Sequence, residues 1–448
     1  MSGQLLTLNA GSSSLKFALY GFDDEQGAQR EQTRGAGWAS PGPGGALKQA
    51  PGRPKLASPP RGAGWAPPGP GGALMQRLSG QVEGFGTHPH LSARFTDGTT
   101  GIDRRWDATD PRAPADAESA LGVVLEWLHD AATPLEVRAI GHRVVHGGTR
   151  YAAPILIDDA VLAHLATLEP LAPLHQPHNL AGMRAARAHF PGIPQVACFD
   201  TAFHRGHDFA EEAFGIPREY HEAGVLRYGF HGLSYEYIAQ RLAELDPEAA
   251  AGRTIVAHLG SGASICAMRA GRSVSSSMGF TPLDGLPMGT RPGQLDPGVL
   301  LWLMTERGMD AAALSDLLYH RCGLKGLSGV SNDLRDLHAS DAPGAREAID
   351  YFVARLRREI GGLAAVLGGV DALVFTAGIG ENDVALRAET LATTGWLGLA
   401  VDAAANATHG SGRDGLISPP GARIRVWVIP TNEELMIARH TAALTSTR

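Results

Sequence analysis

Polar residues that could bind or transfer an anionic group lie directly after predicted strands of this chain. Asn9 opens the run NAGSSSLK, Arg143 lies in GHRVVHGG, and Asp200 lies in FDTAFH. An arginine inside an apolar strand is costly unless it meets an anion, and its planar guanidinium suits a carboxylate or a phosphate. A structural ion pair is the alternative for Arg143. Asp200 could position a nucleophile or cap the next helix.

Glycine-rich runs form a second group of candidates, because glycine lets the backbone approach a ligand and serine adds hydroxyl donors. NAGSSSLK carries Lys16, and it is not a P-loop, since GxxxxGK[ST] is absent. An ordinary hairpin turn is its alternative interpretation. FTAGIGEN, at 375–382, lacks the GxGxxG pattern of dinucleotide sites, and a nucleotide lying against its glycines fits better.

The segment 277–298 holds five glycines and four prolines around Arg291. A loop this long with so many restricted dihedrals is usually functional, and Arg291 could clamp a phosphoryl group in transfer. Glu433 and Glu434 follow a predicted strand in the run IPTNEE. An acidic oxygen ligand with waters and substrate phosphates suits Mg²⁺. An acidic pair at a helix N-terminus is the alternative.

Histidines occur at several of these places. His175 lies in the Pro-rich loop LAPLHQPHN, where a surface role is the alternative to catalysis. His231 precedes a predicted helix and could instead bond to the backbone there. His142 and His146 are predicted to be structural, because a strand places residues four apart too far from each other for one metal ion.

The elements that would position these residues alternate along the chain. Strands, or strands running into loops, are predicted at 4–9, 15–22, 137–148, 195–203, 253–271, 371–382 and 422–434. Helices are predicted at 116–131, 157–168, 179–189, 233–245, 297–307, 310–319, 344–367 and 433–446. This alternation predicts an α/β fold with mostly parallel central strands, whose carboxyl ends bind ligands.

A strand, a Gly/Ser turn and a second strand occur both at 4–20 and at 253–270. This repeated pattern suggests two related halves, each with a hairpin turn facing a phosphate. By contrast, RGAGWASPGPGGAL at 34–47 recurs as RGAGWAPPGPGGAL at 61–74. Such Pro- and Gly-rich sequence buries little apolar surface, so we interpret 27–78 as a flexible surface insertion. A partner motif anchored by Trp38 and Trp65 is the alternative.

Composition limits the class of protein. The 448 residues favour two domains, and a net charge of −7 offers no basic footprint for nucleic acid. The cysteines Cys198, Cys266 and Cys322 are odd in number and widely spaced, which favours reduced thiols over disulfides or zinc. The N-terminal sequence lacks the pattern of a signal peptide and no apolar run is long enough to span a bilayer. We therefore expect a cytoplasmic protein without membrane partners.

Taken together and in order, the motifs resemble those of the acetokinase family, within the superfamily of actin, sugar kinases and heat-shock ATPases. The resemblance covers nearly the whole chain outside 27–78 and rests on NAGSSSLKF (9–17), GHRVVHGG (141–148), LAPLH (171–175), FDTAFH (199–204), YGFHG (228–232), HLGSGAS (258–264), SMGFTPLDGLPMGTR (277–291), GVSNDLRD (329–336), FTAGIGEN (375–382) and PTNEE (430–434).

The resemblance implies two related ribonuclease H-like domains of the actin-like ATPase kind, with the active site in the cleft between them. The first would comprise 1–200 and 432–448, and the second, 201–431, would bind the nucleotide and form a homodimer. The implied reaction is reversible transfer of the γ-phosphoryl of ATP to acetate, giving acetyl phosphate and ADP, with Mg²⁺ or, in its place, Mn²⁺. A propionate or butyrate kinase, or a nucleotide-binding relative without catalysis, is the alternative.

Roles for individual residues follow from the same resemblance. Arg143 and Arg291 would flank the carboxylate and the phosphoryl group, Asp200 would position the carboxylate or the metal's water shell, and His231 and His175 would assist the transfer. Asn9 and Glu433 would support the metal ion. The methyl group of the substrate would meet Val145, Leu174, Phe230 and Pro282. Nucleotide contacts would come from Lys16, His258, Gly260, Ser261, Gly262, Asp333, Leu334, Arg335, Gly378, Ile379, Gly380 and Asn382.

The chain departs from the usual pattern of the family at four positions, Gln176, Ser261, Pro292 and Gln294. Ser261 affects one implied phosphate contact, and Pro292 and Gln294 flank Arg291. None of the four replaces a residue with an implied chemical role, so we expect activity to be retained. Val145 favours acetate over propionate, because the family members that prefer propionate tend to have a smaller residue there.

Overall fold

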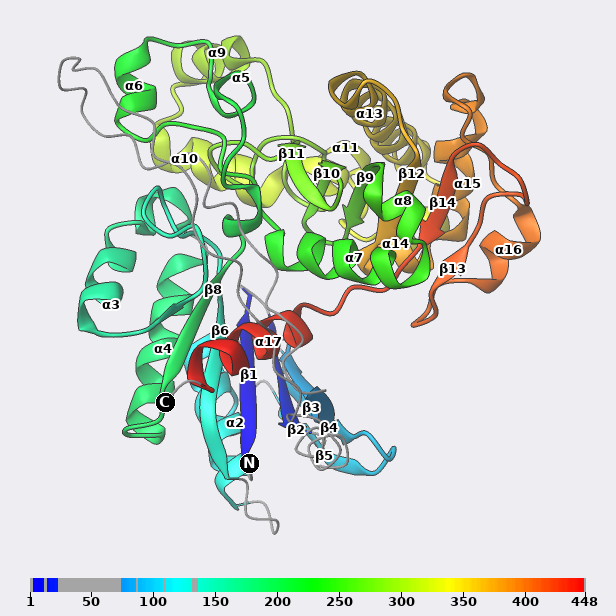
Figure 1. Ribbon diagram of the computed structural model, residues 1–448. Coiled ribbons are helices and arrows are strands. Elements are labelled where there is room, and N and C mark those ends of the chain that lie inside the picture. The colour runs from blue at the N-terminus through cyan, green and yellow to red at the C-terminus, as the bar shows by residue number, and fades with distance from the viewer. Residues whose placement is uncertain are drawn as a thin grey trace, which may run out of the picture.

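Two β-sheets organise the chain, and helices cover both faces of each (Figure 1). The computed structural model describes residues 3–11, 14–22, 74–85, 88–107, 109–130, 136–173 and 175–446. Within these ranges no helix combines the length and the hydropathy needed to cross a bilayer.

The first sheet has eight strands in the order β5-β4-β3-β2-β1-β6-β8-β7. Its strands are β1 (Gln4–Ala10), β2 (Ser14–Phe22), β3 (Leu74–Glu83), β4 (His90–Phe95), β5 (Thr100–Arg105), β6 (Val137–Val144), β7 (Ile155–Leu156) and β8 (Gln195–Phe199). Only the pairs β1–β6 and β6–β8 are parallel. The antiparallel extension β3–β5 was not predicted, because its strands bury one face only and carry many polar residues on the other.

Helices cover the two faces of this sheet differently. One face packs against α2 and α4, and the other against α17, which lies over β1, β6 and β8. Figure 1 shows α17, in red, between the first sheet and α7. The helices associated with this sheet are α2 (Ala117–Asp130), α3 (Asp159–Ala166), η1 (Glu169–Leu171), α4 (Gln176–His189) and α17 (Glu433–Thr445).

The second sheet has six strands in the order β11-β10-β9-β12-β14-β13. Its strands are β9 (Arg253–Leu259), β10 (Ala263–Arg269), β11 (Arg272–Ser276), β12 (Ala372–Thr376), β13 (Gly415–Leu416) and β14 (Arg425–Val428). Each sheet thus contains an antiparallel hairpin, β1–β2 or β9–β10, whose first strand also pairs in parallel with a later strand, β6 or β12. The two halves are therefore built alike, as the repeated sequence pattern predicted.

Two long helices sandwich the second sheet. These are α7 (Gly232–Leu245) on one face and α13 (Pro343–Leu367) on the other. Shorter elements complete this half: η2 (Ala202–His204), α5 (Phe209–Glu212), α6 (Arg218–Glu222), α8 (Pro247–Ala251), α9 (Pro297–Arg307), α10 (Ala311–Asp316), η3 (Leu317–Arg321), α11 (Gly323–Ser328), α12 (Leu334–His338), α14 (Ala377–Asn382), α15 (Val384–Ala392), η4 (Gly395–Leu397) and α16 (Ala403–Thr408).

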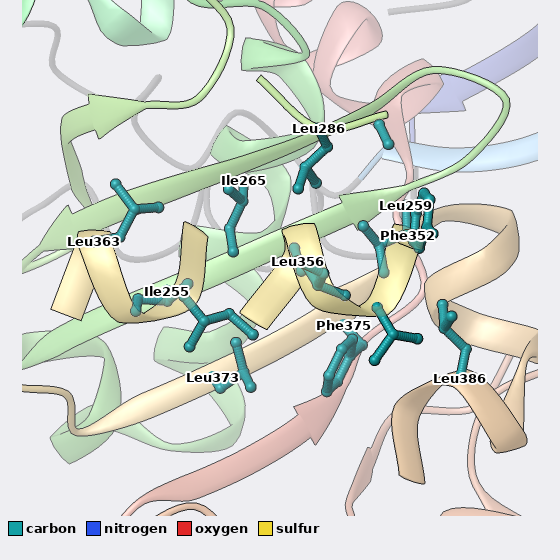
Figure 2. Close-up of a cluster of buried hydrophobic side chains, with 14 of the residues drawn as sticks. Ile255, Leu259, Ile265, Leu286, Phe352, Leu356, Leu363, Leu373, Phe375 and Leu386 are labelled. Carbon is teal, nitrogen blue, oxygen red and sulfur yellow. The ribbon is translucent and has the colours of Figure 1, made fainter. Parts of the chain in front are cut away.

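The largest hydrophobic core lies between α13 and the second sheet. Figure 2 shows Phe352 and Leu356 of α13 among Ile255, Ile265 and Phe375 of the strands, all of them buried. The helix has a proline at its first position, and it ends at a glycine with φ of 70°. A rigid base of this kind holds the loops at the carboxyl ends of β9 and β12 in place.

Most predicted elements are confirmed within a few residues, and two predictions were wrong in part. The glycines of GIGEN form the helix α14 rather than a turn. Residues 74–78 belong to β3 and not to an insertion. The rest of the predicted insertion, 27–73 with Trp38 and Trp65, lies outside the described residues.

We expect Gly141→Ala to loosen α17 from the first sheet. A Cβ on Gly141 of β6 would overlap Thr441 and Ile437 of α17, and overpacking of a core typically costs about 1–3 kcal/mol. Gly122→Ala is the matched control, because a Cβ on this residue of α2 meets nothing within 4 Å and should stabilise the helix by about 0.5–1 kcal/mol. Urea denaturation measures both. Equal stability of the two variants would contradict this account of the α17 contact.

Candidate active site

A largely buried ion pair joins β6 of the first sheet to the residue that directly follows β8 of the same sheet. Arg143, on β6, donates from Nε to both carboxylate oxygens of Asp200 at 3.0 and 3.1 Å, and from Nη2 to Oδ2 at 2.6 Å. The Asp200 side chain is 1% exposed and that of Arg143 is 16% exposed. Asp200 also accepts a bond from the backbone N–H of His231. It holds an arginine and a backbone turn, and it is not the N-cap of a helix.

Residues from the two ends of the described chain meet beside this pair. Asn9, near the end of β1, accepts a hydrogen bond from Nη1 of Arg143 at 3.1 Å. Its Nδ2 donates to Glu433 at 3.0 Å and to Glu434 at 3.2 Å, both in the first turn of α17. Nε of Arg143 lies 3.9 Å from Glu433. The predicted metal-supporting residues Asn9 and Glu433 are therefore in direct contact.

Burial and pairing act in opposite directions on the charges of this cluster. Burial favours the neutral form of Arg143, but Asp200 and Glu433 outweigh it and raise the pKa of the guanidinium above its ordinary value. Burial raises the pKa of Asp200, although Arg143 acts in the opposite direction. Burial also acts to raise the pKa of Glu433, but Arg143, with His258 and Lys16, outweighs it and lowers that pKa. Arg143 and Glu433 are thus held in their charged forms.

Arg291 brings a second guanidinium to the same place from the loop between β11 and α9. Its Nη1 donates to the carbonyl oxygen of Pro282 at 2.8 Å. Within the described residues it forms no ion pair with a carboxylate. Burial lowers its pKa, and the charge of Arg143 lowers it further. The two like charges therefore lie close enough to interact, and of the two, within the part of the chain that the structure describes, only Arg143 has a carboxylate partner.

Gly262, in the turn between β9 and β10, marks the point where Arg291 approaches His231. A Cβ on Gly262 would lie 3.1 Å from Nη2 of Arg291 and 3.3 Å from Nε2 of His231. Glycine lets the backbone come close to both groups without displacing them. The structure thus brings the predicted catalytic side chains of Arg291 and His231 together at one turn, and the charge of Arg143 acts on both of them.

His231 and His258 form a stacked pair at this turn. Their ring centroids are 4.2 Å apart and the ring planes are inclined by 16°. Burial lowers the pKa of His258 to about 4. Burial, the neighbouring His258 and the two arginines hold the pKa of His231 well below its usual range. Both rings are therefore neutral at physiological pH.

His175 is the N-cap residue of α4. Its Nδ1 is buried and has no hydrogen-bond partner within the described residues. Burial lowers its pKa to about 3, and Arg291 and Arg143 contribute further. His175 therefore lies within the field of both arginines, as a neutral group. The preceding residue, Leu174, which was predicted to contact the substrate, lies outside the described residues.

The other predicted apolar contacts are buried residues. Val145, which follows β6 two residues after Arg143, and Phe230, which precedes His231, belong to one hydrophobic cluster. Pro282 is buried and accepts a hydrogen bond from Arg291 through its carbonyl group. Of the three, Pro282 is the one in direct contact with a guanidinium group.

Three segments predicted to bind the nucleotide adjoin one another. A Cβ on Gly260, in the turn after His258, would lie 3.7 Å from Cβ of Ala377, the first residue of α14. His338, the last residue of α12, lies 3.0 Å from Asp383, just after α14. The segments thus form one continuous border; it carries the predicted residues His258, Gly260, Ser261, Gly262, Asp333, Leu334, Arg335, Gly378, Ile379, Gly380 and Asn382.

Members of this border already have partners within the chain. Asp333 caps α12 through the backbone N–H of Arg335 and pairs with its guanidinium at 2.6 Å. Asn382 donates to the carbonyl oxygen of Gly378 at 2.8 Å. A Cβ on Gly378 would meet nothing within 4 Å, so open space adjoins the first turn of α14.

Lys16 lies on β2 opposite Asn9 and is exposed. Its positive charge lowers the pKa of Glu433, so it acts on the acidic end of the site.

Lys16 and Glu434 also line a cavity of about 390 Å³ over β2, β3 and β4. A second cavity, of about 220 Å³, lies around Arg227 and Asp284. Neither cavity is lined by Arg143 or Arg291, so the two arginines are not enclosed by either of them.

The four departures from the family pattern lie at different depths. Gln176 is fully buried and donates to the carbonyl oxygens of His146 and Leu165 at 3.3 and 3.2 Å. Ser261 and Gln294 are exposed, and Pro292 is partly buried. The Gln176 side chain thus has a packing role of its own.

Sequence reasoning missed several residues that hold the site. Asn179 accepts a bond from the backbone N–H of Val145 and donates to the carbonyl of Ala10. Ser234 and Ser264 bind the rings of His258 and His231 at 2.8 Å each. Ser264 ends the motif HLGSGAS, and Ser234 lies two residues after the motif YGFHG. No pattern in the sequence predicted which hydroxyl would face which ring.

Comparison with known proteins places this geometry in a family. Residues 91–439 match the family model described as the Acetokinase family. The chain is 53% identical over 370 residues to the acetate kinase of Nitrobacter hamburgensis, covering 83% of this chain and 90% of that one. It is 49% identical over 444 residues to the acetate kinase of Methylocella silvestris, covering 99% and 98%.

Two solved structures resemble the whole chain. The acetate kinase of Porphyromonas gingivalis is 32% identical with a TM-score of 0.77, over 99% of this chain and 100% of that one. A propionate kinase from Francisella tularensis is 29% identical with a TM-score of 0.78, over 98% and 99%.

We expect the protein to lose stability as the pH falls from about 6.5 toward 4. Burial is the main reason that several histidines have a folded-state pKa of about 3 to 4, whereas the unfolded value is about 6.5. The unfolded state therefore binds more protons in this window, and each such histidine contributes up to about 1.4 kcal/mol per pH unit. The group comprises His142, His146, His175, His204, His207 and His258.

Urea denaturation at pH 7.5, 6.5, 5.5 and 4.5 measures this dependence. The free energy of unfolding should change little between the two higher values and fall steeply below them. A free energy of unfolding that is constant or rises as the pH falls below 6.5 would show that these rings are not neutral in the folded protein.

Proposed function

The chain belongs to the acetokinase family, and we propose how its residues carry out the reaction of that family, the transfer of a phosphoryl group between ATP and acetate. The protein is an enzyme that acts on ATP or ADP and a small carboxylate. The observation that carries the proposal is the charge of Arg291, which is partly buried near Arg143 and has no carboxylate partner within the described residues. A partly buried positive charge without such a partner is unfavourable, and an anionic substrate would supply the missing negative charge.

Arg143 and Arg291 bind the acetate carboxylate and the oxygens of the phosphoryl group in transfer. Arg143 uses three of its five N–H groups on Asp200 and Asn9, which fixes the guanidinium and leaves two donors for a ligand. Arg291 uses one donor on Pro282. Phosphoryl transfer spreads charge over the equatorial oxygens, so fixed positive groups stabilise its transition state.

The reaction needs no general base, because acetate is already ionised at neutral pH. His231 donates an N–H to the phosphoryl oxygens as a neutral group, and His175 assists from another side. Asp200 acts through Arg143, whose orientation it fixes. The methyl group of acetate lies against Val145 and Phe230, which are buried and apolar.

The residues around Glu433 fit Mg²⁺. The lowered pKa of Glu433 keeps it ionised, and its Oε1 accepts no hydrogen bond within the described residues. One or two carboxylates, with waters and substrate phosphates, are the usual ligands of this ion. Glu433 would hold the ion and Asn9 would hold Glu433 in place. When bound, the ion neutralises charge on the phosphates of the nucleotide.

The nucleotide lies along the border formed by the turn after β9, α14 and α12. The phosphates adjoin Gly260 and Gly262, which are partly exposed, and the adenosine adjoins Arg335 and Gly378, beside which there is open space. Lys16 faces the phosphates from β2.

We divide the chain into domains at 1–200 with 432–448, and at 201–431, since the strands of the first sheet end at Phe199 and those of the second end at Val428. Closure of the cleft between them would exclude water from the transfer.

An acid-length series tests the function. Formation of acyl phosphate from ATP and Mg²⁺ is measured with acetate, propionate and butyrate. We expect the highest kcat/KM with acetate, because Val145 takes up space that a longer acid would need; the discrimination should be modest, since one methylene is worth only about 1–3 kcal/mol. A higher kcat/KM with propionate or butyrate would assign the chain to the longer acid. No product with any acid would contradict the catalytic function.

The same assay separates the roles of two arginines. Arg291→Ala should lower kcat about 10²–10³-fold with little change in the KM for ATP, because the lost donor acts on the transition state. Arg335→Ala is the comparison, since its side chain is 90% exposed at the predicted adenosine site, and it should raise the KM for ATP while kcat is retained. Comparable weakening of ATP binding in Arg291→Ala would count against its role.

A homodimer is supported by the surface of α9. None of its eleven residues is buried, although the helix reads PGVLLWLMTER. Leu301 is 64% exposed and Trp302 is 47% exposed, with Leu295, Val299 and Met304 also exposed beside them. An apolar patch of this kind marks an interaction surface, and a second copy of the chain is its proposed partner.

We expect the double variant Leu301→Glu, Trp302→Glu to be monomeric and the unmodified chain to be dimeric. The two carboxylates would have to be desolvated in the interface. Light scattering after size-exclusion chromatography gives the mass. Trp396→Glu is the control, because this residue is 76% exposed on η4, in a different element, and the change should leave the dimer intact. A monomeric unmodified chain would rule the homodimer out.

A further inference from the structure

In the stacked pair His231 and His258, Nδ1 of each ring is hydrogen-bonded to a serine hydroxyl, which is hydrogen-bonded to a second hydroxyl. Nδ1 of His231 lies 2.8 Å from Oγ of Ser264, which in turn lies 2.5 Å from the hydroxyl of Tyr235. Ser264 and Tyr235 are both fully buried. Neither hydroxyl is open to bulk solvent, so the hydrogen bonds of this chain have to be satisfied inside the protein.

The direction of these hydrogen bonds follows from the end of the chain. The Tyr235 hydroxyl has one hydrogen-bond partner within the described residues, which is Ser264. If Ser264 donated to Tyr235, the proton of the tyrosine would be buried without an acceptor, which typically costs about 1–3 kcal/mol. Tyr235 therefore donates to Ser264. The serine has a single proton, and the acceptor left for it is Nδ1 of His231.

His258 shows the same arrangement on the other side of the stack. Thr431 donates from Oγ1 to Oγ of Ser234 at 2.8 Å, and Ser234 lies 2.8 Å from Nδ1 of His258. Ser234 and Ser264 come from different elements, α7 and β10. Two independent serines thus present a hydroxyl proton to the same nitrogen of two adjacent rings.

We infer that Tyr235 and Ser264 are positioning residues that hold His231 as the tautomer protonated on Nε2. This inference rests on the proposed function, because Nε2 is the nitrogen that lies beside Gly262 and Arg291. With Nδ1 occupied by Ser264, the Nε2–H is left to donate to the oxygens of the transferring phosphoryl group. The other tautomer would turn a lone pair toward those oxygens and repel them.

A neutral donor suits a site that already carries two guanidinium groups. Burial, His258 and both arginines disfavour an imidazolium at His231, so a charged form would cost stability. A neutral ring can donate from only one nitrogen, and its use therefore depends on which nitrogen has the proton. The hydroxyl chain makes that choice without adding charge.

The burial of Tyr235 supports the direction of the chain. Burial holds the pKa of this phenol well above its usual range, so it keeps its proton at neutral pH. Its ring packs against Phe203 and lies 6.2 Å from the ring of His258. A donor held in this way cannot rotate toward water.

Nitrogen NMR of the full chain with ¹⁵N-labelled histidine tests the tautomer directly. The signals of His231 are assigned by their loss in His231→Gln, and two-bond proton–nitrogen correlations at pH 7.5 distinguish a protonated from an unprotonated ring nitrogen. We expect a protonated Nε2 and an unprotonated Nδ1. A protonated Nδ1 in the unmodified protein would overturn the inference, whatever the activity.

The variants connect the tautomer to turnover. Ser264→Ala removes the donor to Nδ1, and we expect the Nδ1–H tautomer to become populated. The kcat should fall about 10- to 100-fold, the effect found when a metal-binding histidine loses the hydrogen-bond partner that orients its ring. The KM for ATP should change little. Tyr235→Phe keeps the serine and should give a smaller effect in the same direction, and it serves if Ser264→Ala does not fold. An unchanged kcat in a folded variant whose tautomer has shifted would overturn the role in turnover.

Ser273→Ala is the matched control for removal of a serine that contacts buried rings. Ser273 lies on β11, and its Oγ is 2.8 Å from Nδ1 of His204 and 2.8 Å from Nε2 of His207. The change should leave the His231 signals as they are, and a shifted His231 tautomer in this control would overturn the assignment to Ser264. If the unmodified protein forms no acetyl phosphate, the proposed function fails, while the NMR result still decides the tautomer.

Discussion

The site depends on two partly buried guanidinium groups that share too little negative charge. Arg143 is compensated by Asp200 and by the nearby Glu433, whereas the Arg291 side chain is bonded, among the described residues, to the carbonyl group of Pro282 alone. The packing of both halves of the chain around the site offsets the unfavourable free energy of this arrangement. An anion between the two arginines would restore the balance, which is the basis of the proposed function.

The same constraint explains why the C-terminal helix returns to the first sheet. Arg143 and Asn9 need acidic partners at the carboxyl end of β1, and α17 brings Glu433 and Glu434 there from the other end of the described chain. The helix also packs against α7 of the second half. A shift of α17 would therefore change both the acidic end of the site and the contact between the two halves.

Neutral imidazoles complete the site because its charge leaves no room for more cations. His231, His258 and His175 all lie in the field of Arg143, and burial adds to the same effect. Neutral rings can still donate one hydrogen bond each, provided that the proton is on the correct nitrogen. Buried serine and tyrosine hydroxyls provide that control in the described structure, and they are as much a part of the site as the rings.

The sequence by itself determined the elements and the candidates, because these depend on local patterns. Apolar periodicity located the long helices and the central strands, and the motifs around Arg143, Asp200 and Glu433 stood at strand ends. The antiparallel strands β3, β4 and β5 were not predicted, because the sequence of a half-buried strand with a polar outer face resembles that of a loop. Only the tertiary structure decided that Asp200 pairs with Arg143, that Arg291 has no carboxylate partner in the described part of the chain, and which hydroxyl faces which ring. Those facts depend on distances between residues far apart in the chain, and such distances are set by packing and not by local sequence.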